Sequence, residues 1–136
     1  MRPTVSNRKA MVAGMAPVLE TGRYLFTALE SWPSAEEAAQ LLGVFREDEG
    51  LTAYRRLAPE ADAPPKGVVM VKITLQVYSD LEGVGLTAAV ATALAEEGIP
   101  CNVVAALHHD HLFVPETQGP AALRCLEALI RAAKDE

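Results

Sequence analysis

The chain has 136 residues, of which 50% are hydrophobic and 22% are charged, and its formal net charge is −6. This length and apolar fraction predict one folded unit or two small modules around a real core, and they exclude wholesale disorder. An acidic chain with only 5% aromatic residues offers neither a basic face for phosphates nor a base-stacking surface. We therefore expect no nucleic-acid partner.

Cellular location is predicted from the cysteines and from the start of the chain. Cys101 and Cys125 are the only cysteines, and no signal peptide precedes them, so we expect a cytoplasmic protein with free thiols. No apolar run is long enough to span a bilayer, and we expect no membrane partner. Met1–Ala10 is polar and lacks an apolar core, which predicts a flexible tail over residues 1–12.

A first module is predicted over residues 13–58. Met15–Leu19 and Arg23–Leu29 read as two strands joined by a glycine-containing turn. Leu51–Leu57 reads as a third strand, and its two consecutive arginines favour an edge or exposed position.

A helix is predicted between the second and third of these strands. Ser34 and Glu37 have the spacing of a capping box, in which each side chain accepts a hydrogen bond from the other residue's backbone N–H. Apolar residues then follow at helical spacing up to a glycine that would end the helix: Ala38, Leu41, Leu42, Phe45 and Gly50.

Residues 59–67 contain three prolines and read as a linker, and residues 68–136 form a second module. Apolar residues alternate with more polar ones in the first strand of this module, and the two helices carry apolar stripes. The predicted elements are the strand Val71–Val77, the loop Ser79–Gly85, a helix from Leu86 to near Gly98, the strands Cys101–Leu107 and His111–Val114, and a helix that opens at Gly119.

This βαββα order lacks the fourth strand of a ferredoxin-like unit. We expect Met15–Leu19 or Leu51–Leu57, or a second chain, to supply it. The predicted fold class is α+β, with antiparallel sheets and helices on one face. An unpaired sheet edge such as Cys101–Leu107 favours association, so we also expect a homodimer.

The segment Glu82-Gly83-Val84-Gly85-Leu86 joins the first strand of the second module to its first helix. Val90, Leu94 and the pair Gly98-Ile99 follow at set intervals. This pattern resembles the ACT domain motif, in which aspartate is usual where Glu82 stands and proline is usual where Val84 stands.

Nearly the whole chain after residue 12 is also similar to a family of small, stand-alone bacterial proteins with two ACT-like modules. Related tandem proteins include the cytosolic arginine sensors. The resemblance implies a regulatory protein that binds a small molecule, such as an amino acid. We expect neither catalysis nor a cofactor, because the sequence shows no convergent nucleophile, base and orienting residue. The segments that carry it are Phe45–Thr52, Gly85–Val90, Cys101–Val104 and His109–Pro115.

The loop before the predicted helix also suits an amino acid on physical grounds. Free N–H groups at a helix start bind a carboxylate, and glycine lets a ligand approach the backbone. Asp80, Glu82 or a strand carbonyl would accept from an ammonium group, and Asn102 would either brace the loop or touch the ligand. The alternative is that the glycines only make a tight turn. The predicted site comprises Ser79, Asp80, Glu82, Gly83, Val84, Gly85, Leu86, Thr87 and Asn102.

The predicted first module completes this site from the same chain or a neighbour. Arg46 would bind the carboxylate, Glu49 would bind the ammonium group, and Gly50 lies beside them. The competing functions are an enzyme with His109 or Glu49 as its base, and a structural dimerisation module.

The histidines cluster in one short segment, where His108, His109 and His111 surround Asp110. Histidine and aspartate bind Zn²⁺, but only His109 and His111 share a face of an extended segment. A structural turn is therefore favoured over a metal site, and we expect no metal. A pH-sensitive contact is the other reading of this cluster.

Overall fold

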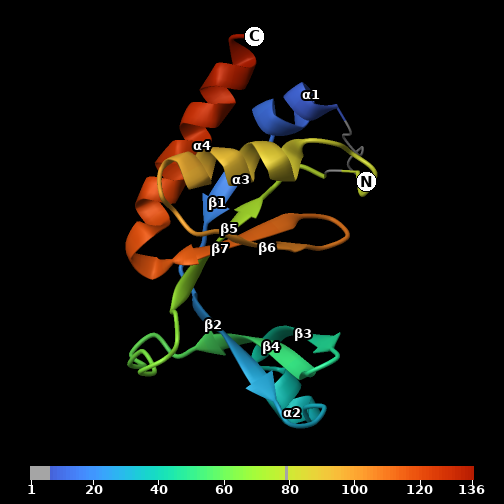
Figure 1. The fold of residues 1–136 in the computed structure, drawn as a ribbon, viewed down its shortest axis with the longest axis vertical. Helices are drawn as coiled ribbons and strands as arrows, with labels where there is room; N and C mark the ends of the chain where they lie inside the picture. Colours follow the sequence, from blue (N-terminus) through green and yellow to red (C-terminus); the bar gives the residue numbers. More distant parts are fainter. Residues whose placement is uncertain (1–6, 79) are drawn as a thin grey trace. The chain divides into compact units, whose positions relative to one another are not determined.

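The computed structural model describes residues 7–78 and 80–136, and the chain folds as two units. Unit 1 combines the described residues up to Glu20 with those from Val71 to Glu136, and unit 2 comprises Thr21–Met70. Both contain helices and antiparallel strand pairs (Figure 1). The predicted α+β class is confirmed.

The sheet of unit 1 has the order β1-β5-β7-β6. Strand β1 (Pro17–Leu19) runs antiparallel to β5 (Met70–Leu75), with Val18 opposite Thr74. Strands β6 (Asn102–Ala105) and β7 (Asp110–Pro115) form an antiparallel hairpin. The expectation that a strand near Met15–Leu19 completes this sheet is thus confirmed.

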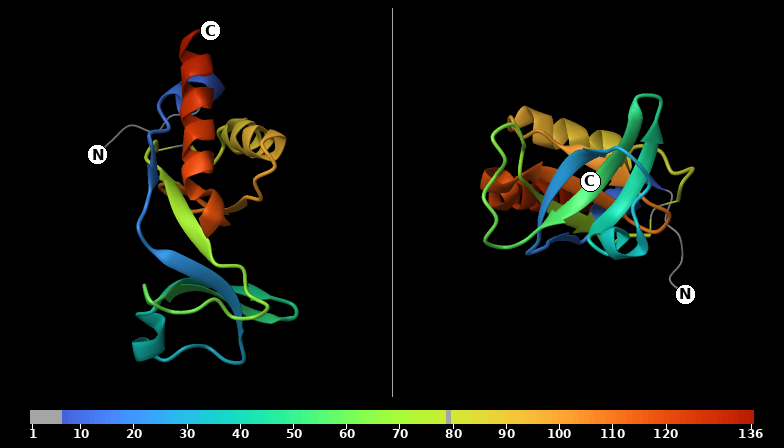
Figure 2. Two further views of the ribbon diagram at one scale, coloured as in Figure 1. Left: turned by 90° about the vertical axis from the view of Figure 1, so that its left-hand side faces the viewer. Right: turned by 90° about the horizontal axis from the view of Figure 1, so that it is seen from below.

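Three helices pack against one face of this sheet. They are α1 (Arg8–Ala13), α3 (Leu86–Glu96) and α4 (Gly119–Lys134), and a short 3₁₀ turn, η1 (Glu116–Gln118), precedes the last. Helix α4 contacts both α1 and β1 (Figure 2). Alternate residues of the strands meet the apolar stripes of the helices. The fully buried members of this core include Ile73, Leu75, Val90, Leu94, Leu112, Val114 and Leu126.

Helix α1 corrects the predicted flexible tail over residues 1–12. The Asn7 side chain accepts from the backbone N–H of Ala10 and so caps the helix. Met11 and Val12 are each only 1% exposed and belong to the core of unit 1. Because these two apolar side chains are buried, the segment is ordered although the residues before them are polar. Residues 1–6 lie outside the described residues.

Unit 2 is a three-stranded antiparallel sheet with the order β3-β4-β2. The strands are β2 (Arg23–Leu29), β3 (Leu41–Glu47) and β4 (Gly50–Leu57). The two ends of the unit meet, since Tyr24 pairs with Met70. Phe26 and Tyr54 lie opposite each other and make an edge-to-face ring contact at 4.8 Å. Such cross-strand aromatic pairs stabilise a sheet.

The helix predicted to run from Ser34 to Gly50 is wrong beyond its first turn. The capping box forms as expected, but α2 covers only Ala35–Ala38 and none of its residues is buried. The chain then enters β3, which pairs with β4 through a tight turn at Asp48 and Glu49. The adjoining strand supplies backbone partners for this apolar segment, so it becomes a strand rather than a helix. As a result β4 is the central strand of unit 2 rather than an edge strand, although Arg56 is exposed, as the other predicted alternative had it.

Residues 58–69 connect β4 to β5 with turns and contain no helix or strand. One arginine of β2 holds the start of this connection. The Arg23 guanidinium donates to the carbonyl of Ala61 at 2.7 Å and to that of Pro59 at 3.2 Å. None of the helices in the described ranges is long and apolar enough to cross a membrane.

Candidate functional site

The loop between β5 and α3 is held by two hydrogen bonds that Asp80 accepts. Its side-chain Oδ1 accepts from the backbone N–H of Glu82 at 2.9 Å, and its carbonyl accepts from the N–H of Gly83 at 2.8 Å. Such an aspartate turn fixes the loop immediately before the helix.

Gly85 is the N-cap residue of helix α3; it has φ +106 and ψ −13, and no side chain caps the helix. The first N–H groups of an α-helix have no acceptor within the helix, and here no side chain at the N-cap takes one of them. Together with the helix dipole, these N–H groups suit a carboxylate or another anion.

The loop borders a cavity of about 170 Å³ within unit 1. Two carboxylates, those of Asp80 and Asp110, share this cavity with the start of α3. Gly83 lets the loop pack closely, because a Cβ at this position would lie 3.1 Å from the Sδ atom of Met11. The cavity is lined by Met11, Asp80, Leu81, Gly83, Gly85, Leu86, Thr87, Ala105, Ala106 and Asp110.

Five of the nine site residues predicted in the second module line this cavity: Asp80, Gly83, Gly85, Leu86 and Thr87. Of the remaining four, three do not line the cavity and one is not among the described residues. Glu82 is exposed and Val84 is 80% exposed, and neither lines the cavity. Asn102 is opposite Phe113 at the far end of β6. Ser79 lies outside the described residues.

The three site residues predicted in the first module belong to unit 2. The Arg46 guanidinium lies over the Trp32 ring, 5.0 Å from its centroid, which is a cation–π distance. Glu49 is exposed in the turn between β3 and β4. Gly50 follows with φ +140, a backbone conformation that favours glycine.

The sequence did not identify five of the cavity-lining residues. Leu81 belongs to the loop itself, Met11 comes from α1, and Ala105, Ala106 and Asp110 come from the β6–β7 hairpin. Of these residues, only Asp110 could have been recognised in the sequence, as a carboxylate at the start of an apolar strand. It is 8% exposed, and aspartate is seldom buried so far unless it is paired.

The histidine segment forms a cluster of rings with Tyr78. Tyr78 stacks on His108 at 5.5 Å and meets His109 edge-on at 4.9 Å. His111 Nδ1 lies 3.1 Å from the Thr74 hydroxyl. Burial lowers the pKa of His111, and the positive charge of Lys72 lowers it further. No group of three or more histidine, cysteine or acidic residues in the described part of the chain is placed to hold a metal ion.

Both cysteines are free and half-buried. Burial raises the pKa of the Cys101 thiol to about 11. Burial, followed by the negative charges of Glu97 and Glu96, raises the pKa of Cys125. Both thiols are therefore protonated near neutral pH, and a thiol in that state is a poor nucleophile.

Two sequence models, each of an ACT domain, match residues 4–63 and 66–128. The chain belongs to the ACT domain family. The suspected tandem ACT arrangement and the ferredoxin-like fold class are therefore confirmed. ACT domains are generally regulatory ligand-binding modules rather than catalytic ones.

Solved structures agree with this assignment. A protein of unknown function from Vibrio cholerae, VC0802, described as a possible transport protein, is 35% identical. The alignment covers 90% of this chain and 94% of that one, with a TM-score of 0.73.

Two further structures share the fold at low identity. Protein Atu0741 from Agrobacterium tumefaciens is 17% identical, with a TM-score of 0.58 over 80% of this chain and 82% of that one. A structure of aspartokinase alpha and beta subunits is 15% identical, with a TM-score of 0.54 over 85% of this chain and 97% of that one. A search of curated proteins gives no match.

Proposed function

We propose that this ACT protein is a non-catalytic sensor that binds a small α-amino acid in the cavity beside the start of α3. One observation carries the proposal. The loop that bears the ACT motif borders a cavity in which an uncapped helix start lies together with two carboxylates. An amino acid has two opposite charges, and this cavity offers a partner for each.

The ligand carboxylate would bind at the start of α3. Leu86 and Thr87 lie in the first turn of the helix, where backbone N–H groups have no acceptor within the helix. Gly85 places no side chain between the backbone and the ligand. A carboxylate that accepts from two or more N–H groups forms charge-assisted hydrogen bonds, which are stronger than neutral ones.

The ligand ammonium group would bind Asp80, Asp110 or both. Asp110 is the better candidate because it is 8% exposed, so water screens its charge less than that of a surface carboxylate. A cavity of about 170 Å³ is smaller than the roughly 300–1,000 Å³ pockets of drug-sized ligands. The volume therefore favours a ligand with few heavy atoms.

A thermal-shift screen against the amino acids tests this function, because a ligand that binds only the folded state raises the melting temperature. Calorimetry then measures the affinity of each hit for Asp110→Asn, Asp80→Asn and Glu82→Gln. The first two variants should bind less tightly. The third changes a neighbouring acid that does not line the cavity, and it should bind as the wild type does.

Equal affinity in all three variants would exclude the cavity as the binding site. A screen without any hit would favour the structural dimerisation module instead. We also propose that the protein is cytoplasmic and forms a homodimer, as ACT domains typically dimerise. Sedimentation velocity tests the homodimer.

A further inference from the structure

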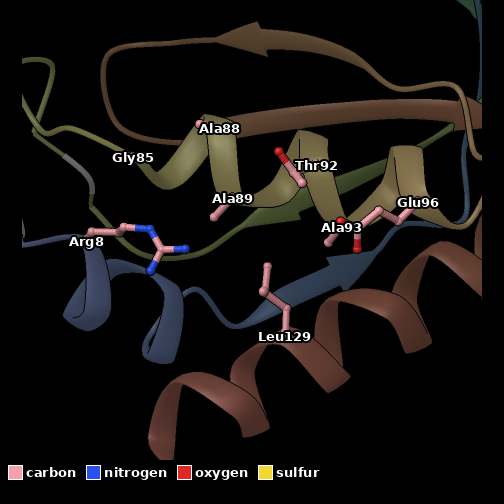
Figure 3. A pocket seen from close by; sticks show the side chains of 8 residues that line it. All are labelled: Arg8, Gly85, Ala88, Ala89, Thr92, Ala93, Glu96 and Leu129. Atoms are coloured by element: carbon pink, nitrogen blue, oxygen red, sulfur yellow. The ribbon is translucent and has the colours of Figure 1, made fainter. Parts of the chain in front are cut away.

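A second groove in unit 1 lies among helices α1, α3 and α4, away from the β6–β7 hairpin (Figure 3). Its volume is about 300 Å³. Apart from Gly85 at one end, α3 contributes small side chains to the groove, namely Ala88, Ala89, Thr92 and Ala93, and α4 contributes Leu129. The charged lining residues are Arg8 of α1 and Glu96 of α3.

Each of these two charges lies at the end of α3 where a helix dipole favours a charge of the opposite sign. The Arg8 side chain passes over Gly85 at the N-terminus of α3, because a Cβ on Gly85 would lie 2.9 Å from its Cδ. Glu96 is the last residue of the helix. A helix dipole favours negative charge at its N-terminus and positive charge at its C-terminus. Both charges are therefore unfavourably placed with respect to α3.

Neither charge has an ion-pair partner in the part of the chain that the structure describes. Figure 3 shows the two side chains extending along the groove toward each other from its ends. A binding partner for this groove would therefore present a negative charge near Arg8 and a positive charge near Glu96.

The surface between the two charges is neutral. Helix α3 contains no charged residue from Leu86 to Ala95, although Ala88, Ala91, Thr92 and Ala95 are exposed. An exposed helix face usually carries charged or polar residues. The side chains here are small, so a second helix can approach closely, and the distance between packed helices depends on the size of the side chains in contact.

We propose that this groove binds the same groove of a second copy of the chain, with the two α3 helices antiparallel across a two-fold axis near Thr92. Ala88 and Glu96 each lie four residues from Thr92, on either side of it along the helix. The axis therefore places Ala88 opposite Glu96 of the partner subunit, and Arg8 meets that carboxylate. Two-fold symmetry makes the same contact twice.

Charge complementarity identifies this partner. In the antiparallel pair, Glu96 of the partner subunit lies at the positive end of α3 and close to Arg8, so both unfavourable placements become favourable ones. The inference rests on the homodimer included in the proposed function and names its interface. It differs from the pairing of sheet edges through β6 that the sequence suggested.

Charge exchange tests the interface on the full chain. Sedimentation velocity over a range of protein concentrations gives the dimer dissociation constant of the wild type, Arg8→Glu, Glu96→Arg and the double variant. Each single substitution places like charges opposite each other twice per dimer. We therefore expect the dimer dissociation constant to rise at least tenfold. The double variant exchanges the two charges and should restore the wild-type value.

An equimolar mixture of the two single variants provides a second reading, because it should form a heterodimer that neither variant forms with itself. Glu127→Arg is the matched control. It makes the same change of charge as Glu96→Arg, but at an exposed position of α4 outside the groove, and it should dimerise as the wild type does. Far-UV circular dichroism checks that every variant is folded.

Three results would overturn the interface. Single variants that dimerise as the wild type does would leave the dimer in place and direct attention to the β6 edge. A double variant that stays as weak as the single ones would remove the Arg8–Glu96 contact. A monomeric wild type at high protein concentration would exclude the dimer altogether, while the amino-acid site would still be decided by the calorimetry of the Asp110 and Asp80 variants.

Discussion

Replacing Gly85 by alanine tests how the start of α3 is built. At φ +106 an L-residue is strained, and a new Cβ would lie 2.9 Å from Cδ and 3.0 Å from Cγ of Arg8. Left-handed backbone costs an L-residue about 1–2 kcal/mol. Forcing a side chain away from its rotamer costs about 0.5–1.5 kcal/mol more. We therefore expect Gly85→Ala to lower the free energy of unfolding by about 1.5–3.5 kcal/mol.

Gly98→Ala is the matched control. Gly98 also has a positive φ, +70, but no atom lies within 4 Å of the position that a Cβ would take. This variant should lose only the backbone cost, about 1–2 kcal/mol. Urea unfolding at one fixed protein concentration measures both variants, and each is measured again with Arg8→Ala. Removing the Arg8 side chain should recover the excess cost of Gly85→Ala and leave that of Gly98→Ala unchanged.

The reasoning fails if the two glycine variants lose the same stability, or if Arg8→Ala changes the cost of both equally. In the first case the contact with Arg8 has no energetic weight. In the second case the coupling is not local to the start of α3. Double-mutant cycles of this kind separate a direct contact from two independent effects.

Three further predictions concern single residues. Because the pKa of His111 is lower in the folded chain than its ordinary value of 6.5, the unfolded chain binds this proton more tightly; the free energy of unfolding should therefore fall as pH drops below about 6.5. His111→Gln should flatten this part of the profile in urea unfolding between about pH 5 and 8, and an unchanged profile would contradict it. Leu126→Ala should cost about 3 kcal/mol in the same assay, because Leu126 is fully buried in the core of unit 1; a loss below about 1 kcal/mol would show that the core relaxes around the missing atoms. Arg46→Ala should leave the affinity of a carboxylate ligand in calorimetry unchanged, because Arg46 contacts Trp32 in unit 2 and does not line the cavity; a weakening by about 1.5–3 kcal/mol, the value of a hydrogen bond to a charged group, would contradict this placement of the site.

The second half of the chain could be predicted because its local signals agree. In β5, Ile73 and Leu75 are buried while Lys72 keeps one face polar. Gly85 and Gly98 stand at the two ends of α3, where positive φ is needed. Local propensity and apolar periodicity pointed to the same elements, and such consistency is the condition under which a sequence can be read directly.

The segment after α2 was wrongly predicted as a helix because its apolar residues are compatible with both a helix and a strand. Leu41, Leu42 and Phe45 fit helical spacing, yet they form β3 beside β4. Strand propensity depends on neighbouring strands, and such a neighbour cannot be read from a window of a few residues. Gly43 was the available counter-signal. A Cβ there would lie 3.6 Å from the Tyr54 ring on the adjacent strand, and glycine is unfavourable inside a helix.

The sequence predicted the part of the candidate site that comes from a single segment, the loop between β5 and α3. Asp80, Gly83 and Gly85 lie close together in the sequence, so the turn and the helix start could be inferred from them. Met11 and Asp110 come from positions far from this loop along the chain, and only the packing of α1 and of the β6–β7 hairpin brings them to it. Contacts between residues so far apart in the sequence produce no periodic pattern from which they could be predicted.

The pairing of β1 with β5 has a consequence for how the protein is made. Thr21–Met70, a single continuous stretch, is inserted between the two parts of unit 1. On the ribosome unit 2 is complete early, and domains generally fold as units with the N-terminal ones first. Unit 1 must wait for α4, so β1 emerges well before most of its partners. A fragment starting at Val71 would lack the strand that covers one edge of β5, and that exposed edge invites aggregation.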